Sequence, residues 1–435
     1  MTESVRHFDV LVVGAGPAGL NAAAAAASHG VRVGLIDAQP RPGGQVWRHD
    51  VAAPQPSPAV GVLATISQHG VEWIAQAQVV QAGPECLLAE TAQGTLRLHY
   101  RALVLATGAR ELLLPFPGWT LPGVTGAGGA QALVKQGWPM IGKRAVVAGS
   151  GPLLLAAALT LKRHGAQVLG IHEQASSAAV RGFALRLPRW PGKAAQALGM
   201  KLQLAGIPYR GGSVVVAAHG DARLREVEID GPRGRERIAC DHLAVGYGLV
   251  PNTELAESLG CRLELAGAHP AVAVDAELRT SVEHVFAAGE ALGIGGRDCA
   301  QVEGAIAGHL AAGHSGPARA VQRKRRHARA FAGLLARSFV LDPRIRSLAD
   351  ADTVVCRCED VTLRQLQGFA SARDARLATR CGMGACQGRI CGAALAELDP
   401  ACVESPGAGR RPPLFPARLA TLAESFSNHS QGATP

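Results

Sequence analysis

Runs of consecutive apolar residues that end in glycine-rich turns recur along the first 300 residues of the chain. The clearest case is residues 8–19, where a β-branched apolar run ends in GAGPAG and an alanine-rich segment follows. An unbroken apolar run of this kind is typical of a parallel strand buried on both faces. The pattern predicts a buried strand, a tight turn and a helix that runs to about His29, with Gly30 as its C-terminal cap.

The glycine spacing of this turn is that of a dinucleotide-binding site. Gly14 permits the turn, Gly16 lets a pyrophosphate approach the backbone, and Gly19 lets the helix lie close to the strand. Free N–H groups at the start of the helix would face the phosphates. A second predicted strand, 31–36, ends at Asp37, 18 residues past Gly19, where a ribose hydroxyl needs an acceptor. The alternative is an ordinary glycine-rich turn between a strand and a helix.

The same pattern returns 135 residues later, in residues 143–152. Two copies of one supersecondary unit imply two nucleotide-binding domains. The second copy is imperfect, because Leu154 stands where Gly19 stands in the first, and the acid Glu173 is displaced by one position. Glu173 without a nearby arginine would favour NAD over NADP. The second domain therefore either binds a nucleotide or is a degenerate copy kept for packing. The glycines that correspond to Gly14, Gly16 and Gly30 are Gly149, Gly151 and Gly165.

Two further apolar runs end in small-residue turns. Residues 102–105 lead into Ala106-Thr107-Gly108, where the backbone could lie against a cofactor, and residues 285–288 lead into Gly289 and Glu290. Glu290 could accept from a ribityl or ribose hydroxyl. Gln301 and Val302 open a predicted helix whose N-terminus could face the isoalloxazine carbonyls. Ordinary strand ends are the alternative interpretation.

Composition limits the classes of function. The chain has 435 residues and is 48% hydrophobic, which allows two or three globular domains. A formal net charge of +10 favours anionic ligands or an acidic partner, but no aromatic-rich basic module indicates nucleic acid. The most apolar run, 146–161, contains glycine, serine and proline, so it predicts no membrane span. Residues 1–9 contain no apolar signal segment, and we expect a cytoplasmic protein.

Three segments outside these patterns carry further expectations. Residues 317–337 read as a helix with the basic run 323–327, which predicts either a solvated face or a site for a membrane surface or a partner. Residues 51–60 predict a surface loop. The tail after about Glu404 is rich in Pro, Gly, Ser and Arg, and we expect its end to be disordered.

Five of the ten cysteines fall within a short C-terminal stretch. Cys356 and Cys358 are two residues apart, and Cys386 and Cys391 follow in a glycine-rich loop after 27 intervening residues. Ten cysteines in a cytosolic protein indicate thiols or metal ligands and not disulfides. Four thiolates on two loops can bind a [2Fe–2S] cluster or a zinc ion. We favour the cluster because the rest of the chain handles electrons, and we expect Cys381 to be no ligand.

The first 310 residues resemble the two-dinucleotide-domain flavoproteins related to thioredoxin reductase. The shared motifs are GAGPAG, PGGQ at 42–45, ATGA at 106–109 and AAGE at 287–290. The resemblance implies FAD at the first site and, where functional, NAD(P) at the second. No Cys-x-x-Cys lies near 37–50 or 119–150, so no redox disulfide would face the flavin. The FAD-binding residues that the motifs imply are Gly14, Gly16, Pro17, Ala18, Gly19, Asp37, Ala38, Arg41, Gly44, Gln45, Ala106, Thr107, Gly108, Gly289, Glu290, Gln301 and Val302. Those of the second site are Gly149, Gly151, Pro152 and Glu173.

The cysteine segment resembles the bacterioferritin-associated-ferredoxin-like [2Fe–2S] domain, with CRCEDVT at 356–362 and GMGACQGRIC at 382–391. A flavoprotein followed by such a domain resembles the larger subunits of bacterial heteromeric amine dehydrogenases. That group includes opine oxidases, the B-type subunit of hydrogen cyanide synthase and D-hydroxyproline dehydrogenases. The resemblance implies that a separate D-amino-acid-oxidase-like flavoprotein subunit oxidises the amine, that this chain relays the electrons, and that a small ferredoxin-like subunit can join.

The sequence thus predicts an α/β chain with two Rossmann-like dinucleotide-binding domains and a small C-terminal [2Fe–2S] domain. The expected function is electron relay in the dehydrogenation of an amine, opine or imino acid. One alternative is a self-sufficient NAD(P)H-dependent flavin reductase, and another is a non-catalytic subunit with structural zinc. The expected boundaries are 1–117 and 246–315 for the FAD domain, 118–245 for the second domain, 316–351 for a basic helix and linker, 352–400 for the [2Fe–2S] domain and 401–435 for the tail.

Overall fold

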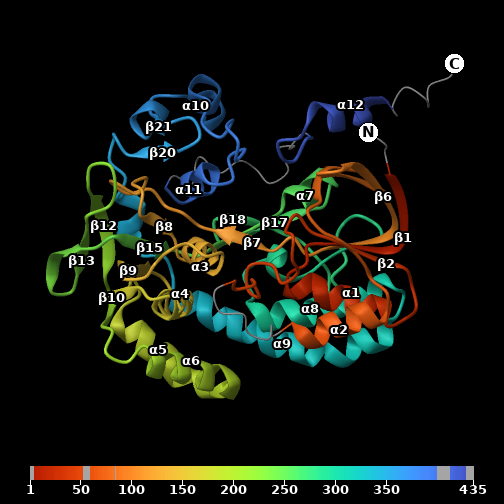
Figure 1. Cartoon of the computed structure of the whole chain (residues 1–435), viewed down its shortest axis with the longest axis horizontal. Helices are drawn as coiled ribbons and strands as arrows, with labels where there is room; N and C mark the ends of the chain where they lie inside the picture. The colour runs from red at the N-terminus through yellow and green to blue at the C-terminus, as the bar shows by residue number, and fades with distance from the viewer. Residues whose placement is uncertain (1–3, 52–58, 84, 399–411, 428–435) are drawn as a thin grey trace.

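The computed structural model describes residues 4–51, 59–83, 85–398 and 412–427 (Figure 1). The predicted surface loop at 51–60 lies mostly outside these residues, as does the end of the tail. Two parallel sheets with helices packed against them dominate the fold, and a cysteine-rich segment lies above the second sheet in Figure 1. We call the two sheets with their helices the first and second domains.

The first sheet is built around two long parallel neighbours, β1 and β6, which pair from Ser4↔Leu96 to Val13↔Leu105. The apolar run 102–105 noted in the sequence is thus the end of a longer strand that begins at Gly94. β4 and β5 extend the sheet in antiparallel fashion, and β19 pairs with the end of β6. In spatial order the strands are β3 (Glu72–Ile74), β2 (Val33–Ile36), β1 (Ser4–Val13), β6 (Gly94–Leu105), β5 (Cys86–Thr91) and β4 (Gln78–Ala82), with β19 (Val285–Ala287) beside β6.

Four helices lie together below this sheet in Figure 1, namely α1 (Pro17–Ala27), α2 (Val60–Gln68), α8 (Arg297–Ala311) and α9 (Ser315–Ser338). Close packing of α1 on α8 depends on glycine, because a Cβ at Gly304 would lie 2.0 Å from the Ala18 carbonyl oxygen. Helix α1 ends at Ala27 with Ser28 as its C-terminal cap, so the helix is shorter than the predicted one to His29, and Gly30 follows with φ +75° as part of the turn and not as the cap.

The second domain repeats this design around β9. Its five parallel strands are covered by α3 to α6, and a three-stranded antiparallel sheet is attached. The spatial order is β11 (Tyr209–Gly211), β10 (Gln167–Glu173), β9 (Arg144–Gly149), β15 (His242–Gly246) and β8 (Val124–Gly126). The helices are α3 (Ala127–Lys135), α4 (Leu153–Arg163), α5 (Ser177–Arg186) and α6 (Pro191–Gln203), and the antiparallel strands are β12 (Val214–His219), β13 (Glu226–Gly231) and β14 (Gly234–Ala239).

Short elements connect the two domains and carry the C-terminal segment. The connecting elements are β7 (Ala109–Glu111), β16 (Leu249–Pro251), α7 (Glu254–Ser258), β17 (Leu263–Ala266) and β18 (His269–Val272). The C-terminal ones are β20 (Val354–Cys356), β21 (Val361–Thr362), α10 (Ala372–Thr379), α11 (Cys391–Leu398) and α12 (Leu419–Ser427). The tail thus contains a helix, and its end, which we expected to be disordered, lies outside the described residues.

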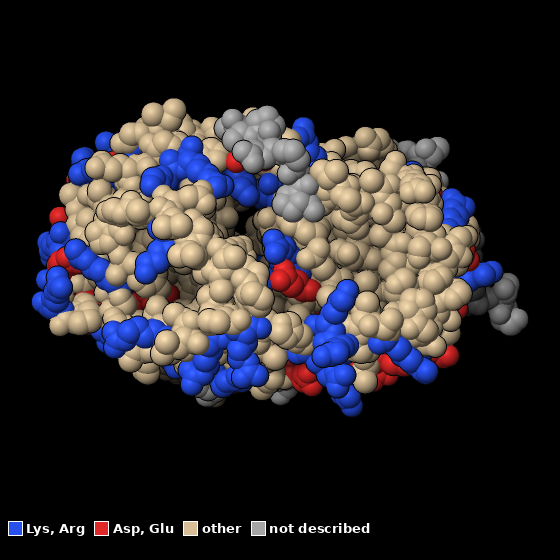
Figure 2. Space-filling model, turned by 90° about the horizontal axis from the view of Figure 1, so that it is seen from below, with Lys and Arg blue, Asp and Glu red and all other residues tan. Residues whose placement is uncertain are grey.

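The tail is held against the first sheet by its own side chains. Leu414 is buried in the core on the far side of the sheet from α1, and the Thr421 hydroxyl donates to Glu90 at 2.7 Å. Among the described residues, no helix is long and apolar enough to cross a membrane. Figure 2 shows Lys and Arg outnumbering Asp and Glu on one face, as the net charge requires.

Candidate functional site

The predicted FAD-binding turns meet at one edge of the first sheet. The strand ends Val13, Ile36 and Leu105 are in register with one another, and Ala287 pairs with Leu105. The residues that follow these four strands therefore lie side by side at the carboxyl edge, where α/β sheets bind their ligands. The structure brings together 14–19, 37–38, 106–108 and 289–290, as the sequence predicted.

The first glycine turn is shaped by close backbone contacts. Gly14 has φ +101°, and a Cβ there would lie 2.3 Å from the Ala106 carbonyl oxygen. A Cβ at Gly19 would lie 1.7 Å from the Gly14 oxygen. Gly16 differs from both, because its nearest neighbour would be the Gly44 Cα at 4.0 Å. Packing does not require glycine at this position, and the space in front of it suits an approaching phosphate. Pro17 is the first residue of α1, and Ala18 is buried in that helix.

Asp37 is placed to bind a ribose at this edge. Its Oδ2 accepts from the Ala15 N–H at 2.6 Å, its Oδ1 accepts from the Gln39 N–H at 2.7 Å, and the side chain is only partly buried. Ala38 and Arg41 are exposed beside it, and Gly44 and Gln45 continue the loop toward Gly16. A half-exposed carboxylate with free lone pairs fits the acceptor role that a ribose hydroxyl needs.

The Ala106–Gly108 turn is fastened to the returning chain. The Thr107 hydroxyl donates to the Asn252 carbonyl oxygen at 2.6 Å, and the Asn252 amide donates to the Thr107 carbonyl oxygen at 2.9 Å. These reciprocal bonds hold the turn beside the first glycine turn, where we predicted that a cofactor would lie.

Glu290 offers an acceptor that the described residues leave unused. Its Oε1 accepts from the Gly296 N–H at 2.7 Å, whereas its buried Oε2 has no partner in the described part of the chain. Burial raises the pKa of Glu290, and a hydroxyl donor would satisfy the second oxygen. This orphaned oxygen fits the ribityl or ribose contact that we predicted.

Helix α8 begins earlier than expected. It starts at Arg297, so Gln301 and Val302 lie in its second turn and do not open it. The free N–H groups at its start belong to the residues after Gly296. If the isoalloxazine faces this helix end, then the residues near 297 contribute more to the contact than the predicted pair does.

Sequence reasoning missed the buried acid Glu303 on α8. Its oxygens accept from Arg329 Nε at 2.8 Å, from Arg325 Nε at 3.0 Å and from the Gly289 N–H at 3.2 Å. The basic run of α9 is thus only partly a solvated face, because two arginines in it or close to it neutralise a carboxylate that is 0% exposed. The sequence did contain a signal for this ion pair. Glu303 directly follows the predicted cofactor contact Val302, and the next predicted helix carries a basic run.

The second glycine turn repeats the glycine spacing of the first but not its full backbone or its surroundings. Gly149 has φ +132°, similar to Gly14, whereas Gly151 has φ +82° where Gly16 has φ −76°. Glu173 accepts from the Gly151 N–H at 2.7 Å and from the Ala175 N–H at 2.9 Å, and the Tyr209 hydroxyl lies 3.3 Å from its Oε2. The side chain is 0% exposed, and burial raises its pKa. Pro152, at the start of α4, corresponds to Pro17 of the first turn, and neither has an N–H to offer a phosphate.

The five clustered cysteines converge. The sulfurs of Cys356, Cys381 and Cys391 lie within 4.8 Å of one another and are buried, while Cys358 and Cys386 are in contact with each other closer to solvent. The structure thus brings all four predicted ligands together, but it also places Cys381 among them. Whether Cys381 is a ligand stays a prediction from spacing, and its position makes it the alternative ligand.

The loop around Cys386 suits a metal-bound sulfur. Burial alone would raise the pKa of Cys386, but N–H groups of Ile390, Gly388 and Arg389 donate to its sulfur and the net effect lowers that pKa. Hydrogen bonds of this type stabilise a thiolate or a cluster sulfur. By contrast, the neighbouring Cys381 and burial raise the pKa of Cys391, so a cation is needed to hold that thiol ionised. The donor set is thiolate only, which fits an iron–sulfur cluster or zinc.

The cysteine loop is docked on the first domain. Arg389 lies between Cys386 and Cys391, and its carbonyl oxygen accepts from Arg110 Nε at 3.0 Å. Both arginines pair with the buried Glu254, Arg110 at 3.1 Å and Arg389 at 3.5 Å. Arg110 follows the Ala106–Gly108 turn by two residues. The candidate metal centre and the candidate flavin edge are therefore connected by one shared contact.

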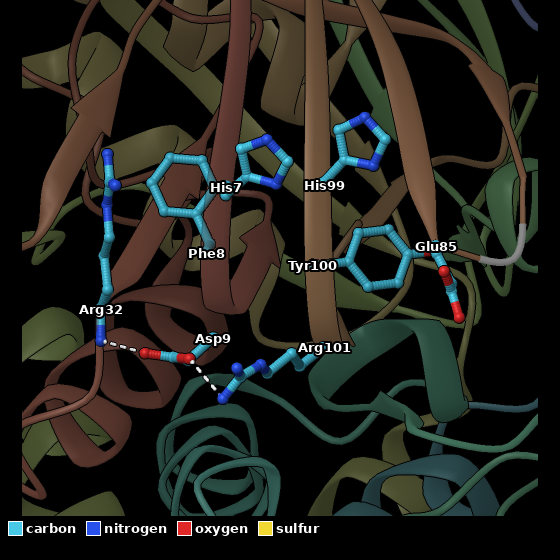
Figure 3. A pocket seen from close by; sticks show the side chains of 8 residues that line it. All are labelled: His7, Phe8, Asp9, Arg32, Glu85, His99, Tyr100 and Arg101. Carbon is cyan, nitrogen blue, oxygen red and sulfur yellow. Dashed lines mark hydrogen bonds and ion pairs between the residues drawn. The ribbon is translucent and has the colours of Figure 1, made fainter.

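A shallow pocket lies at the opposite, amino end of the first sheet (Figure 3). His7 and His99 stack there with ring centroids 4.8 Å apart, and Asp9 accepts from the Arg32 N–H and pairs with Arg101. The figure shows the Asp9 carboxylate between the backbone N–H of Arg32 and the Arg101 guanidinium, while the Arg32 guanidinium points away from it. This pocket is separate from the carboxyl edge and does not belong to the nucleotide site.

Taken together, the paired Rossmann-like sheets and glycine turns define a flavoprotein with two dinucleotide-binding folds. Residues 8–312 match the family described as pyridine nucleotide-disulphide oxidoreductase, and the chain belongs to this family. It is thus an FAD-dependent oxidoreductase, which confirms the predicted enzyme class.

The resemblance drawn from the motifs is confirmed by two relatives. The chain is 33% identical to the A-type subunit of opine oxidase from Rhizobium meliloti, covering 96% of this chain and 98% of the relative. It is also 33% identical to the HcnB subunit of hydrogen cyanide synthase from Pseudomonas aeruginosa, covering 88% of this chain and 90% of the relative. The match to the opine oxidase subunit leaves out too few residues to exclude the cysteine segment.

Solved structures support the fold. L-proline dehydrogenase from P. horikoshii has a TM-score of 0.69 over 97% of this chain and 80% of its own, at 16% identity. Thioredoxin reductase from T. acidophilum has a TM-score of 0.54 over 71% of this chain and 98% of its own, at 22% identity. The predicted α/β class with Rossmann-like domains is confirmed, while the exact domain boundaries stay predictions.

Proposed function

We propose that this chain is the FAD- and [2Fe–2S]-containing subunit of a heteromeric dehydrogenase that oxidises an amine, opine or imino acid. In this proposal a partner flavoprotein subunit of the D-amino-acid-oxidase type removes the electrons from the substrate. This chain receives and relays them, and a small ferredoxin-like subunit can complete the assembly. Both relatives are named as subunits of larger enzymes, which supports this assignment.

The contact between Arg389 and Arg110 is the observation that carries the proposal. It joins the loop of Cys386 and Cys391 to the strand that leaves the Ala106–Gly108 turn. A bound flavin accepts two electrons and an iron–sulfur cluster carries them one at a time, so a short fixed path between the two sites is what a relay needs. Glu254, buried beneath both guanidinium groups, fixes this geometry because each arginine pairs with it.

We propose Cys356, Cys358, Cys386 and Cys391 as cluster ligands. They come from two loops, and the backbone N–H groups around Cys386 would stabilise the negative charge of the cluster. Cys381 is buried among them and is proposed as a neighbour that does not ligate. For FAD, the proposed holders are the first glycine turn with Gly44, the ribose acceptor Asp37 and the orphaned oxygen of Glu290.

Metal analysis of the anaerobically purified chain tests the cluster. We expect two irons with labile sulfide per chain, and one zinc would instead support the non-catalytic alternative. Cys386→Ser should abolish the visible and EPR signals of the cluster. Cys86→Ser is the matched control, because Cys86 is a half-buried thiol remote from the cysteine cluster. If Cys381→Ser retains the cluster, the proposed ligand set is supported. If it loses the cluster, Cys381 is a ligand in place of one of the four proposed cysteines.

Anaerobic reduction tests the relay. The chain alone, and then with its co-expressed partner, is mixed with NADH or with a panel of opines, D-hydroxyproline and glycine, while flavin bleaching is recorded. We expect reduction by an amine only when the partner is present. Rapid bleaching by NADH would favour the self-sufficient reductase, and bleaching of the isolated chain by an amine would place substrate oxidation on this chain.

A further inference from the structure

The second glycine turn is covered by a distant part of the same chain. A Cβ at Gly151 would lie 3.6 Å from Cγ and 3.8 Å from Cδ2 of Phe339. In the first domain, the corresponding position at Gly16 faces only the Gly44 Cα, at 4.0 Å. The middle glycine of such a turn is the point at which a pyrophosphate approaches the backbone. An aromatic ring therefore lies in the second domain where the phosphates of a dinucleotide would lie.

The ring belongs to a segment that crosses three strand ends. We call residues 339–344, which follow α9, the strap. The Ser150 hydroxyl, just after β9, donates to the Phe339 carbonyl oxygen at 3.3 Å. Arg344 Nη2 donates to the carbonyl oxygen of Gly212, just after β11, at 3.2 Å. The strap thus follows the carboxyl edge on the side of β9, β10 and β11, which is the half of a Rossmann fold that binds adenosine diphosphate.

Gln174 holds the middle of the strap with both ends of its side-chain amide. Its Nε2 donates to the Val340 carbonyl oxygen at 3.3 Å, and its Oε1 accepts from the Asp342 N–H at 2.8 Å. Gln174 directly follows Glu173, the acid that corresponds to a ribose acceptor. Gln174, which is placed to face a nucleotide, thus forms its side-chain hydrogen bonds with the backbone of the strap.

Glu173 is closed to a ribose for a second, independent reason. Both of its oxygens accept backbone N–H groups, the Tyr209 hydroxyl adds a third contact, and the side chain is 0% exposed. Asp37, its counterpart in the first domain, accepts two backbone bonds but is only partly buried. A ribose hydroxyl can reach Asp37 from the edge of the sheet, whereas Glu173 serves to hold the turn around Gly151.

We propose that the strap occupies the adenosine-diphosphate half of the second Rossmann fold, and that Phe339 is the specificity-determining residue that excludes NAD(P)H from this protein. The second domain then binds a peptide segment of its own chain. Any nicotinamide nucleotide would have to displace that segment before binding. This inference is independent of the proposed relay function, because it concerns nucleotide binding and not electron transfer.

The strap is anchored at both ends, so that it remains in place. Before it, α9 is tied to the first domain through Arg325 and Arg329 on Glu303. Phe339 itself packs edge-on against Phe183 of α5, with ring centroids 5.1 Å apart. After it, Ile345 is buried in the core of the second domain. Opening the site would require breaking these contacts together, which makes spontaneous exposure rare.

Equilibrium binding of NADH and of ADP-ribose to the purified flavin-loaded chain tests the proposal. We expect no saturable binding to the natural chain, and a gain of at least about tenfold in affinity for ADP-ribose in Phe339→Ala. Leu335→Ala is the matched control, since Leu335 lies one turn earlier in the same apolar cluster, whereas the three atoms nearest to a Cβ at Gly151 all belong to Phe339. A gain in Phe339→Ala without a gain in Leu335→Ala supports the assignment.

A second variant keeps the test decisive if the backbone of the strap still blocks the site. In it, residues 339–341 are replaced by three glycines, and circular dichroism and flavin content check that the chain folds. Saturable NADH binding by the natural chain would overturn the proposal. So would failure of both variants to bind ADP-ribose, because the strap would then not be the excluding element. Neither result depends on whether an amine reduces the flavin, so failure here and failure of the relay are distinguishable.

Discussion

The two glycine turns of this protein share one sequence spacing but differ at the middle glycine, whose φ is −76° at Gly16 and +82° at Gly151, and they have opposite surroundings. The first, at Gly14 and Gly16, opens onto space bordered by Gly44 and by the half-exposed Asp37. The second, at Gly149 and Gly151, is filled by Phe339 and closed by the fully buried Glu173. A dinucleotide-binding motif in the sequence therefore predicts the local fold and not whether the folded site binds a nucleotide. What the folded site accepts depends on residues far away in the sequence.

The comparison also shows how one acid can serve two purposes. In the first domain Asp37 has capacity left for a ligand, and in the second Glu173 uses its oxygens to satisfy buried N–H groups. A buried carboxylate with its acceptors filled stabilises the fold, whereas a half-exposed one remains available for binding.

The largest expected contrast comes from placing valine at the middle glycine of each turn. Gly16 has φ −76°, which any residue adopts, so we expect Gly16→Val to fold but to bind FAD at least about 100-fold more weakly, because the side chain fills the phosphate space. Flavin content and apoprotein melting measure the two effects. Gly151→Val should instead destabilise the fold by about 1–2 kcal/mol, through its φ of +82° and its contact with Phe339. Equal loss of ligand in both variants would contradict the comparison.

Exchanging the two acids for alanine gives the next largest effect. We expect Glu173→Ala to lower the free energy of unfolding by about 2 kcal/mol or more, because two buried N–H groups lose their acceptor. Asp37→Ala should change stability much less, since water can replace its carboxylate, but it should weaken FAD binding about tenfold. Denaturant unfolding of the apoprotein and flavin titration separate the two outcomes, and a reversed pattern would show that the roles are assigned wrongly.

Acidification should destabilise the second domain before the first. Burial lowers the pKa of His172 and of His242 from 6.5 to about 4, so both are neutral in the folded state. Because the unfolded chain takes up these protons below pH 6.5, the free energy of unfolding falls as the pH drops from 6.5 toward 4. The slope is about 1 kcal/mol per pH unit for each histidine.

Hydrogen exchange at pH 7 and pH 5 measures this effect domain by domain. His242→Gln should flatten the dependence in the second domain, and His99→Gln, at a more exposed histidine of the first sheet, is the control. Greater loss of protection in the first domain at pH 5 would contradict the expectation.

The smallest expected loss of stability comes from a substitution at the end of the strap. Arg344 pairs with Asp230 at 2.8 Å and with Asp342 at 2.9 Å, but its side chain is 42% exposed. We expect Arg344→Ala to cost less than about 1 kcal/mol of stability and the effect to shrink at high salt. Thermal unfolding at low and high ionic strength tests this, and a large loss independent of salt would indicate that Arg344 contributes through packing.

The sequence predicted the parts of the fold whose cause is local. Gly14, Gly16 and Gly19 specify a strand, turn and helix by spacing alone, and Cys356 with Cys386 indicates a metal centre by the same logic. The register of β1 with β6 then brings the predicted turns together, because carboxyl ends of parallel strands share an edge.

What the sequence could not predict depends on contacts between distant residues. Phe339 lies 188 positions from Gly151, and nothing in the pattern around it indicates a nucleotide site. The partnership of Arg329 with Glu303 and the position of Cys381 beside Cys391 have the same origin. The sequence alone assigns no partner to the basic run at 323–327 or to Cys381, because their contacts form only through tertiary packing.

Trp119 gives the molecule an optical reporter of its cysteine segment. Its indole N–H donates to the Val354 carbonyl oxygen at 2.6 Å, and the Arg357 guanidinium lies 5.3 Å from its ring centre, next to Cys356 and Cys358. If chelation of the metal releases this segment, the indole of Trp119 loses its contacts with Val354 and Arg357 and becomes exposed to water. The chain has five tryptophans, so the part of the emission change that Trp119→Phe abolishes reports, without any label, whether the metal-binding segment is in place.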